Sequence, residues 1–78
     1  MSASGDARLV ATLWQLSMND DRLACVVYRQ ADGLQLTVES PTAVIVREPF
    51  DMQPRALARA RALCTSLKRR GWQDDAPR

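Results

Sequence analysis

Residues 22–39 read RLACVVYRQADGLQLTVE, and this stretch decides the fold. Its first half is rich in β-branched and aromatic residues, which favour a strand. Its second half alternates, so that Leu34, Leu36 and Val38 share one side of a strand and polar residues share the other. The Asp-Gly pair at 32–33 is a strong signal for a hairpin turn. The stretch therefore predicts two antiparallel strands, the second of which is half-buried.

The segment before this hairpin, residues 8–17, fits two structures. The alternation typical of a strand is carried by Val10, Thr12, Trp14 and Leu16. Leu9 and Leu13 have the four-residue spacing of a helix, which Asp6 would cap. A polar turn cluster at 18–21 separates this segment from the next strand, and two apolar runs around a short turn are typical of a hairpin. We therefore expect a strand.

A further strand is predicted at 43–48, after the break that Pro41 introduces. Its centre is the apolar run Val44-Ile45-Val46. We expect this strand to end at Glu48, because the residue before a proline is restricted and Pro49 follows.

The C-terminal part of the chain has the pattern of an amphipathic helix. Asp51 is a candidate N-cap and Pro54 suits the first turn. Gly71 suits the position after the last turn, where Trp72 is expected to fold back over the apolar stripe. That stripe consists of Ala56, Leu57, Ala60, Leu63, Cys64 and Leu67. The order ββββα predicts an α+β fold, with a four-stranded antiparallel meander and one C-terminal helix on one face.

With 78 residues, the chain is long enough for one domain, which we place at residues 8–72. Residues 1–7 and 73–78 are predicted to be disordered ends. A composition of 46% hydrophobic and 26% charged residues is that of a globular chain, but one this small buries a marginal core unless it is reinforced, for example by self-association. Cys25 and Cys64 lie within apolar patterns and are expected to be packed free thiols.

Residues that commonly carry catalysis or bind metals are scarce. The chain has no histidine, two separated cysteines and three glycines, so we expect no enzyme activity, no catalytic residues, no metal site and no cofactor. The sequence shows no apolar run of membrane-spanning length and no signal-peptide pattern, so we expect a cytoplasmic protein without membrane contact.

Charge is concentrated in residues 52–73, which carry six basic side chains and no acid. The rest of the chain carries five basic and nine acidic residues. This segregation predicts a surface for acidic partners, and two classes of partner remain open. One is nucleic acid, with the arginines on phosphates and Trp14 or Tyr28 as a stacking platform. The other, which we favour, is an unidentified protein, because the overall charge is only +2 and no DNA-reading motif occurs.

The side of the predicted helix away from the sheet is small rather than charged. Steps of about 100° place Ala58, Ala62, Thr65 and Ser66 there. Small residues let another backbone approach closely, although alanines also simply favour helix. The candidate partner-binding residues are Arg55, Ala58, Arg59, Ala62, Ser66, Arg69 and Arg70.

The second face of the sheet is the other candidate surface. The predicted strand at 22–30 is apolar on both faces, whereas a solvated face is normally polar. We therefore expect a homodimer formed through the sheet, although a few exposed apolar residues are normal. Trp14, Val26 and Tyr28 are the candidate residues for this dimer or stacking face.

A resemblance supports the fold. Short uncharacterised bacterial proteins of ββββα type resemble this chain in Trp14-Gln15-Leu16, Leu23-Ala24-Cys25, Phe50 and the segment 60–72. These are core and turn residues spread over most of the chain, so the resemblance implies a fold and no function. The strand and helix order is also similar to antitoxin domains of the HicB kind. The glycine-rich segment of that family is missing here, so no functional residue is carried over.

Overall fold

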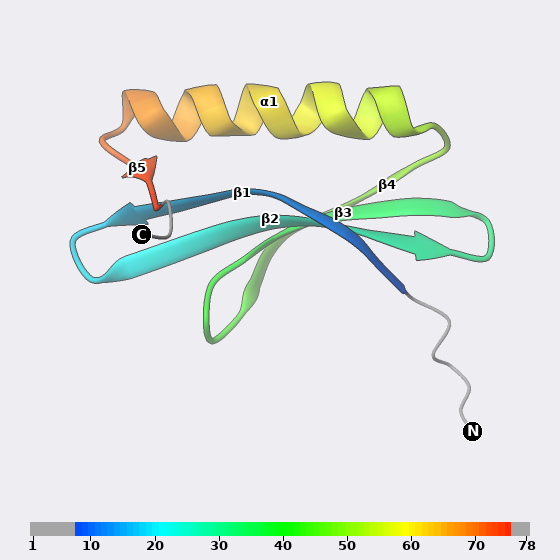
Figure 1. The fold of residues 1–78 in the computed structure, drawn as a ribbon, viewed down its shortest axis with the longest axis horizontal. Coiled ribbons are helices and arrows are strands. Elements are labelled where there is room, and N and C mark those ends of the chain that lie inside the picture. The colour runs from blue at the N-terminus through cyan, green and yellow to red at the C-terminus, as the bar shows by residue number, and fades with distance from the viewer. Residues whose placement is uncertain (1–7, 76–78) are drawn as a thin grey trace.

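The computed structural model describes residues 8–75, which form an antiparallel sheet with one helix on one of its faces (Figure 1). The strands are β1 (Arg8–Met18), β2 (Asp21–Gln30), β3 (Gly33–Glu39), β4 (Val44–Phe50) and β5 (Gln73–Asp74), and the helix is α1 (Gln53–Arg69). The predicted α+β fold, a four-stranded meander followed by a helix, is confirmed. Residues 8–17 are a strand, as their turn-flanked pattern predicted.

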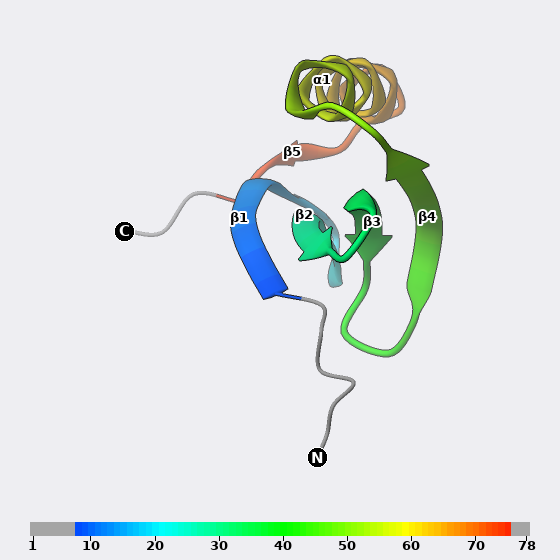
Figure 2. The same ribbon diagram turned by 90° about the vertical axis from the view of Figure 1, so that its right-hand side faces the viewer.

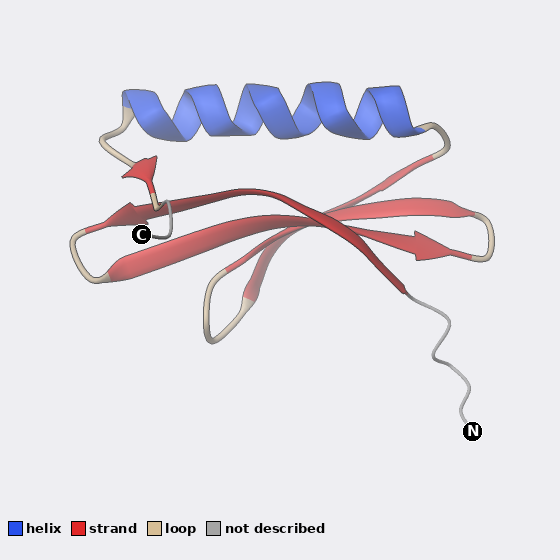
Figure 3. Ribbon diagram, viewed as in Figure 1, coloured by secondary structure: helices blue, strands red, loops and turns tan. Residues whose placement is uncertain are grey.

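The strands lie in the order β4-β3-β2-β1-β5, so consecutive strands of the meander are neighbours (Figure 3). The β2–β3 hairpin fixes the register, because Val27 pairs with Leu36 and Cys25 with Val38. Gly33 begins β3 with a φ of 144°, and a Cβ there would lie 2.7 Å from the Phe50 backbone oxygen. A glycine is therefore required where this hairpin passes the end of β4.

α1 lies over one face of the sheet (Figure 2), and the buried core is formed by residues of α1 and of that face. Its buried residues are Leu23, Cys25, Leu36, Val38, Ala56 and Ala60. Two alanines at four-residue spacing let the helix approach the sheet closely. Half-buried side chains close the rim of this core: Leu13, Trp14, Val46, Phe50, Leu63, Leu67 and Trp72. Leu57, which was predicted on the buried stripe, stays 39% exposed because it lies at the edge of that stripe.

Both ends of α1 can be compared with the prediction. Met52, not Asp51, is the N-cap, and no side chain caps the first turn. At the other end, Gly71 has a φ of 109° and its N–H donates to the Lys68 carbonyl oxygen, while the Trp72 N–H donates to that of Leu67. This pair of bonds is a Schellman motif. It returns Trp72 to the core, as predicted.

Two boundaries differ from the prediction. β4 continues through Pro49 to Phe50, because β4 is an edge strand and a proline is tolerated where no N–H has to pair. Gln73 and Asp74, predicted as the start of a disordered tail, form β5 beside Ser17 and Leu16, and the Asp75 N–H donates to the Gln15 carbonyl oxygen. The predicted disorder of residues 1–7 and 76–78 lies outside the described residues.

Candidate functional site

The outer face of α1, which we define as Ala58, Ala62, Thr65 and Ser66, is exposed at all four positions. These residues lie opposite the buried Ala56 and Ala60, as the helical period requires. Their side chains are short, so an approaching element would meet the helix at close range. The predicted candidates Ala58, Ala62 and Ser66 are therefore accessible.

The six basic residues of α1 and its C-cap separate into two groups. Arg59 donates from Nε and a terminal guanidinium nitrogen to the two carboxylate oxygens of Glu48 on β4, at 3.0 Å each. Lys68 donates from Nζ to Asp74 on β5, also at 3.0 Å. The hydrogen bond to Glu48 raises the pKa of Arg59, and the hydrogen bond to Asp74 raises the pKa of Lys68. Both cations are thus partly neutralised by the sheet.

The other four cations form no ion pair with any acid of residues 8–75. They are Arg55, Arg61, Arg69 and Arg70, and all four are exposed. We call them the free arginines. Of the predicted partner-binding arginines, Arg55, Arg69 and Arg70 belong to this group and Arg59 does not. The sequence showed that β4 carries an acid but did not show which arginine it would pair with.

Trp14 does not lie on the open face of the sheet, where it was predicted as a dimer or stacking residue. Its indole N–H donates to the Ala60 carbonyl oxygen at 2.8 Å, so the ring packs under α1. The cause is a register shift in β1 between Thr12 and Trp14, where Thr12 pairs with Val26 and Trp14 with Cys25. This β-bulge places two alternating residues on opposite faces.

Val26 and Tyr28 do lie on the open face, where Tyr28 is hydrogen-bonded and Val26 is buried. The Tyr28 hydroxyl donates to Glu39 Oε2 at 2.9 Å, and the Thr37 hydroxyl donates to the same oxygen at 2.7 Å. Hydrogen bonding to Glu39 raises the pKa of Tyr28, and burial adds to the shift. Val26 is 7% and Thr37 3% exposed without any helix above them. The centre of this face is therefore covered by its own side chains.

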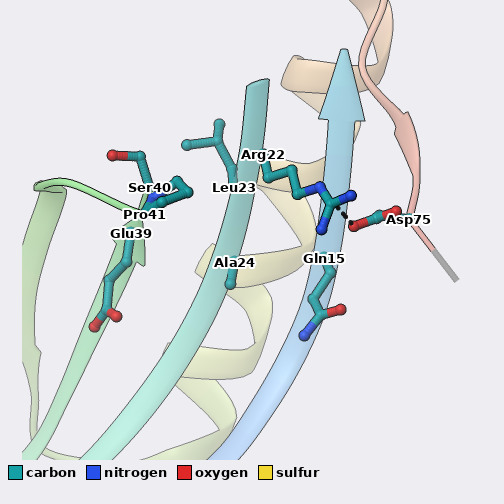
Figure 4. A pocket seen from close by; sticks show the side chains of 8 residues that line it. All are labelled: Gln15, Arg22, Leu23, Ala24, Glu39, Ser40, Pro41 and Asp75. Atoms are coloured by element: carbon teal, nitrogen blue, oxygen red, sulfur yellow. Dashed lines mark ion pairs between the residues drawn. The ribbon is translucent and has the colours of Figure 1, made fainter. Parts of the chain in front are cut away.

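A shallow hollow of about 270 Å³ lies at one end of the open face (Figure 4). It is lined by Gln15, Arg22, Leu23, Ala24, Glu39, Ser40, Pro41 and Asp75. Arg22 approaches Asp75 at 3.9 Å, a long contact between an exposed guanidinium and a half-buried carboxylate. The hollow brings together one cation, Arg22, and two carboxylates, Glu39 and Asp75. Glu39 already accepts hydrogen bonds from Tyr28 and Thr37.

Metal ligands and thiols are the remaining chemically reactive groups of residues 8–75. No cluster of three or more acids, cysteines or histidines there could hold a metal ion. Cys25 is buried and Cys64 half-buried, both as free thiols, as predicted. Burial raises the pKa of Cys25 to about 11, which keeps it protonated and unreactive. Within the same residues, α1 is neither long nor apolar enough to cross a membrane.

Comparison with known proteins adds no assignment: no protein-family model, no curated protein and no solved structure matched this chain. The candidate site therefore rests on the geometry of α1 alone.

Proposed function

We propose that this protein is a small non-enzymatic interaction module that docks on another protein through the outer face of α1. One observation carries the proposal: exposed short side chains are bordered by arginines that the sheet does not neutralise. Such a face suits a partner element that packs closely at its centre and presents carboxylates at its rim. The sheet would hold that face in place. The module would act in the cytoplasm and as a homodimer.

Nucleic acid is a weaker candidate for the same surface. Two of the six cations are occupied by Glu48 and Asp74, which leaves four for phosphates. Trp14 is packed under α1, so it offers no stacking platform. Tyr28 lies beside the Glu39 carboxylate, which would repel a phosphate backbone. Each of these contacts favours a protein partner.

Photo-crosslinking in cells tests the proposal. A photoreactive phenylalanine analogue replaces Ala62 at the centre of the outer face, and Thr12, which is exposed on the open face of the sheet, serves as the matched control position. We expect a discrete adduct with another protein from position 62, and at most an adduct between two copies of this chain from position 12. Equal adducts at the two positions, or a nuclease-sensitive adduct at 62, would contradict the proposal.

The arginines provide a second control within the same experiment. Changing Arg55, Arg69 and Arg70 together to Gln should abolish the adduct without unfolding the domain, since all three are exposed and unpaired within residues 8–75. Arg59→Gln alone should leave it largely intact, because that guanidinium is held by Glu48. An adduct that survives the triple change would show that the free arginines do not contribute.

A further inference from the structure

A groove of about 370 Å³ is formed by the β1–β2 turn, the β3–β4 loop and the residue that follows the cap of α1. We call it the turn groove. Its apolar lining consists of Leu23, Pro41, Ile45 and Trp72. Ile45 is 59% exposed, so a large aliphatic side chain stands uncovered beside the groove within the described chain. An apolar lining of this kind gives a ligand something to pack against.

The walls of the turn groove are held by local hydrogen bonds. The Ser40 Oγ accepts from the N–H groups of Thr42 and Ala43, at 3.3 and 3.1 Å, which fixes the β3–β4 loop. The Trp72 N–H is bound within the Schellman motif. The β1–β2 turn is a tight connection of two residues, 19–20. A surface that is already ordered loses little conformational freedom when a ligand binds.

Two carboxylates line the same groove. Asp20 and Asp21 are both exposed, and neither forms an ion pair with a cation of residues 8–75. Arg22 also lines the groove, but its guanidinium extends to Asp75 in the neighbouring hollow (Figure 4). The free arginines of α1 are not among the lining residues. The turn groove therefore combines an apolar wall with two carboxylates that have no partner in the described chain.

We infer that the turn groove receives a lysine or arginine side chain from a peptide segment of a partner. Long basic side chains lay their methylene stem on apolar surface and keep the charged head in water. Here the stem would pack on Pro41, Ile45 and Trp72, and the head would reach Asp20 and Asp21. An acidic side chain would be repelled by these carboxylates, and an uncharged one would gain nothing from them.

The size of the turn groove sets what it can hold. Its volume lies at the lower end of the range of about 300–1,000 Å³ that is usual for ligand sites, which suits a single long side chain rather than a folded element. The inference goes beyond docking on α1 and does not depend on it. A partner could use either surface alone.

Nuclear magnetic resonance of the full chain tests the inference, with the indole N–H of Trp72 as reporter and that of Trp14, which is bound to Ala60, as internal control. Trp72→Phe identifies the reporter signal. N-acetyl-lysine amide should shift this signal saturably and bind about two- to fivefold tighter than N-acetyl-norleucine amide, which has the stem without the charge. N-acetyl-glutamate amide should bind more weakly than both. A reporter that does not move with the lysine probe, or equal binding of all three probes, would overturn the inference.

Variants separate the charged and the apolar part of the groove. Asp20→Asn with Asp21→Asn should abolish the preference for the lysine probe over the norleucine probe, whereas Asp32→Asn, at an exposed acid in the β2–β3 turn, should keep it. A preference that survives the double change would overturn the role of the two carboxylates.

Ile45→Ser should weaken both the lysine and the norleucine probe about threefold or more, because it removes apolar contact area. Leu9→Ser is the matched control, since Leu9 is 63% exposed and does not line the groove. Equal binding by these two variants would overturn the role of the apolar wall. The triple change of Arg55, Arg69 and Arg70 to Gln should leave probe binding unchanged, so a failure of α1 docking and a failure of the turn groove are separately visible.

Discussion

Replacing Trp14 by Phe removes the indole N–H that donates to the Ala60 carbonyl oxygen at 2.8 Å. A net hydrogen bond contributes about 0.5–1.5 kcal/mol. The smaller ring also buries less apolar area, which costs roughly 0.5–1 kcal/mol at about 25 cal/mol per Å². Together these predict a loss of about 1–2.5 kcal/mol. A domain of this length has a total stability of about 4–12 kcal/mol.

Urea denaturation followed by far-ultraviolet circular dichroism measures this loss, and thermal unfolding should show a melting temperature lower by about 5–15 °C. Trp72→Phe is the matched control, because Trp72 packs on the same core without an indole hydrogen bond to residues 8–75. Trp14→Phe should be the more destabilising of the two by about 1 kcal/mol. A Trp14→Phe variant as stable as wild type would refute the placement of this ring under α1.

Three further predictions concern single positions. Gly33→Ala should destabilise the domain by about 1–3 kcal/mol in urea denaturation, because the alanine Cβ would meet the Phe50 backbone oxygen at 2.7 Å and the φ of Gly33 is 144°. An unchanged urea midpoint would contradict this geometry. Tyr28 is the only tyrosine, so absorbance at 295 nm reports its ionisation. The pKa of Tyr28 should lie above 10.0 in wild type, and Glu39→Gln should move this pKa back towards 10.0. Equal titrations of the two proteins would exclude the hydrogen bond. Burial raises the pKa of Cys25 from 9.0 to about 11, so its contribution to stability is complete below pH 9 and is lost between about pH 9 and 11. Cys25→Ala should therefore flatten the plot of unfolding free energy against pH in that interval. An equally steep plot would contradict the burial of Cys25.

The elements of the fold followed from local pattern. The Asp-Gly turn, the alternation of Leu34, Leu36 and Val38 and the Gly71 cap each act over a few residues, and each is present in the structure. Trp72 returned to the core because a Schellman turn fixes its direction. Interactions that extend over a few neighbouring residues are therefore the part of this structure that sequence specifies directly.

The faces of β1 did not follow from pattern. Alternation placed Thr12 and Trp14 together, and a bulge between them separates the two. A bulge depends on how β1 fits its neighbours β2 and α1, so it has no signature within β1 itself. The same limit applies to the cations: whether Arg59 or Arg55 pairs with Glu48 depends on the packing of α1 over β4. The six basic residues were visible in the sequence, but the division into free and paired was not.

The central claim is that the free arginines of α1 border a surface for a protein rather than a grip on phosphate. Fluorescence anisotropy of labelled single-stranded and duplex DNA and RNA, titrated at about 50 and 200 mM salt, tests it most directly. We expect no binding by the wild-type chain at low micromolar concentration even at 50 mM salt. Tight binding that falls about 50- to 150-fold at 200 mM, as four phosphate contacts would require, and that disappears when Arg55, Arg69 and Arg70 become Gln, would contradict the claim.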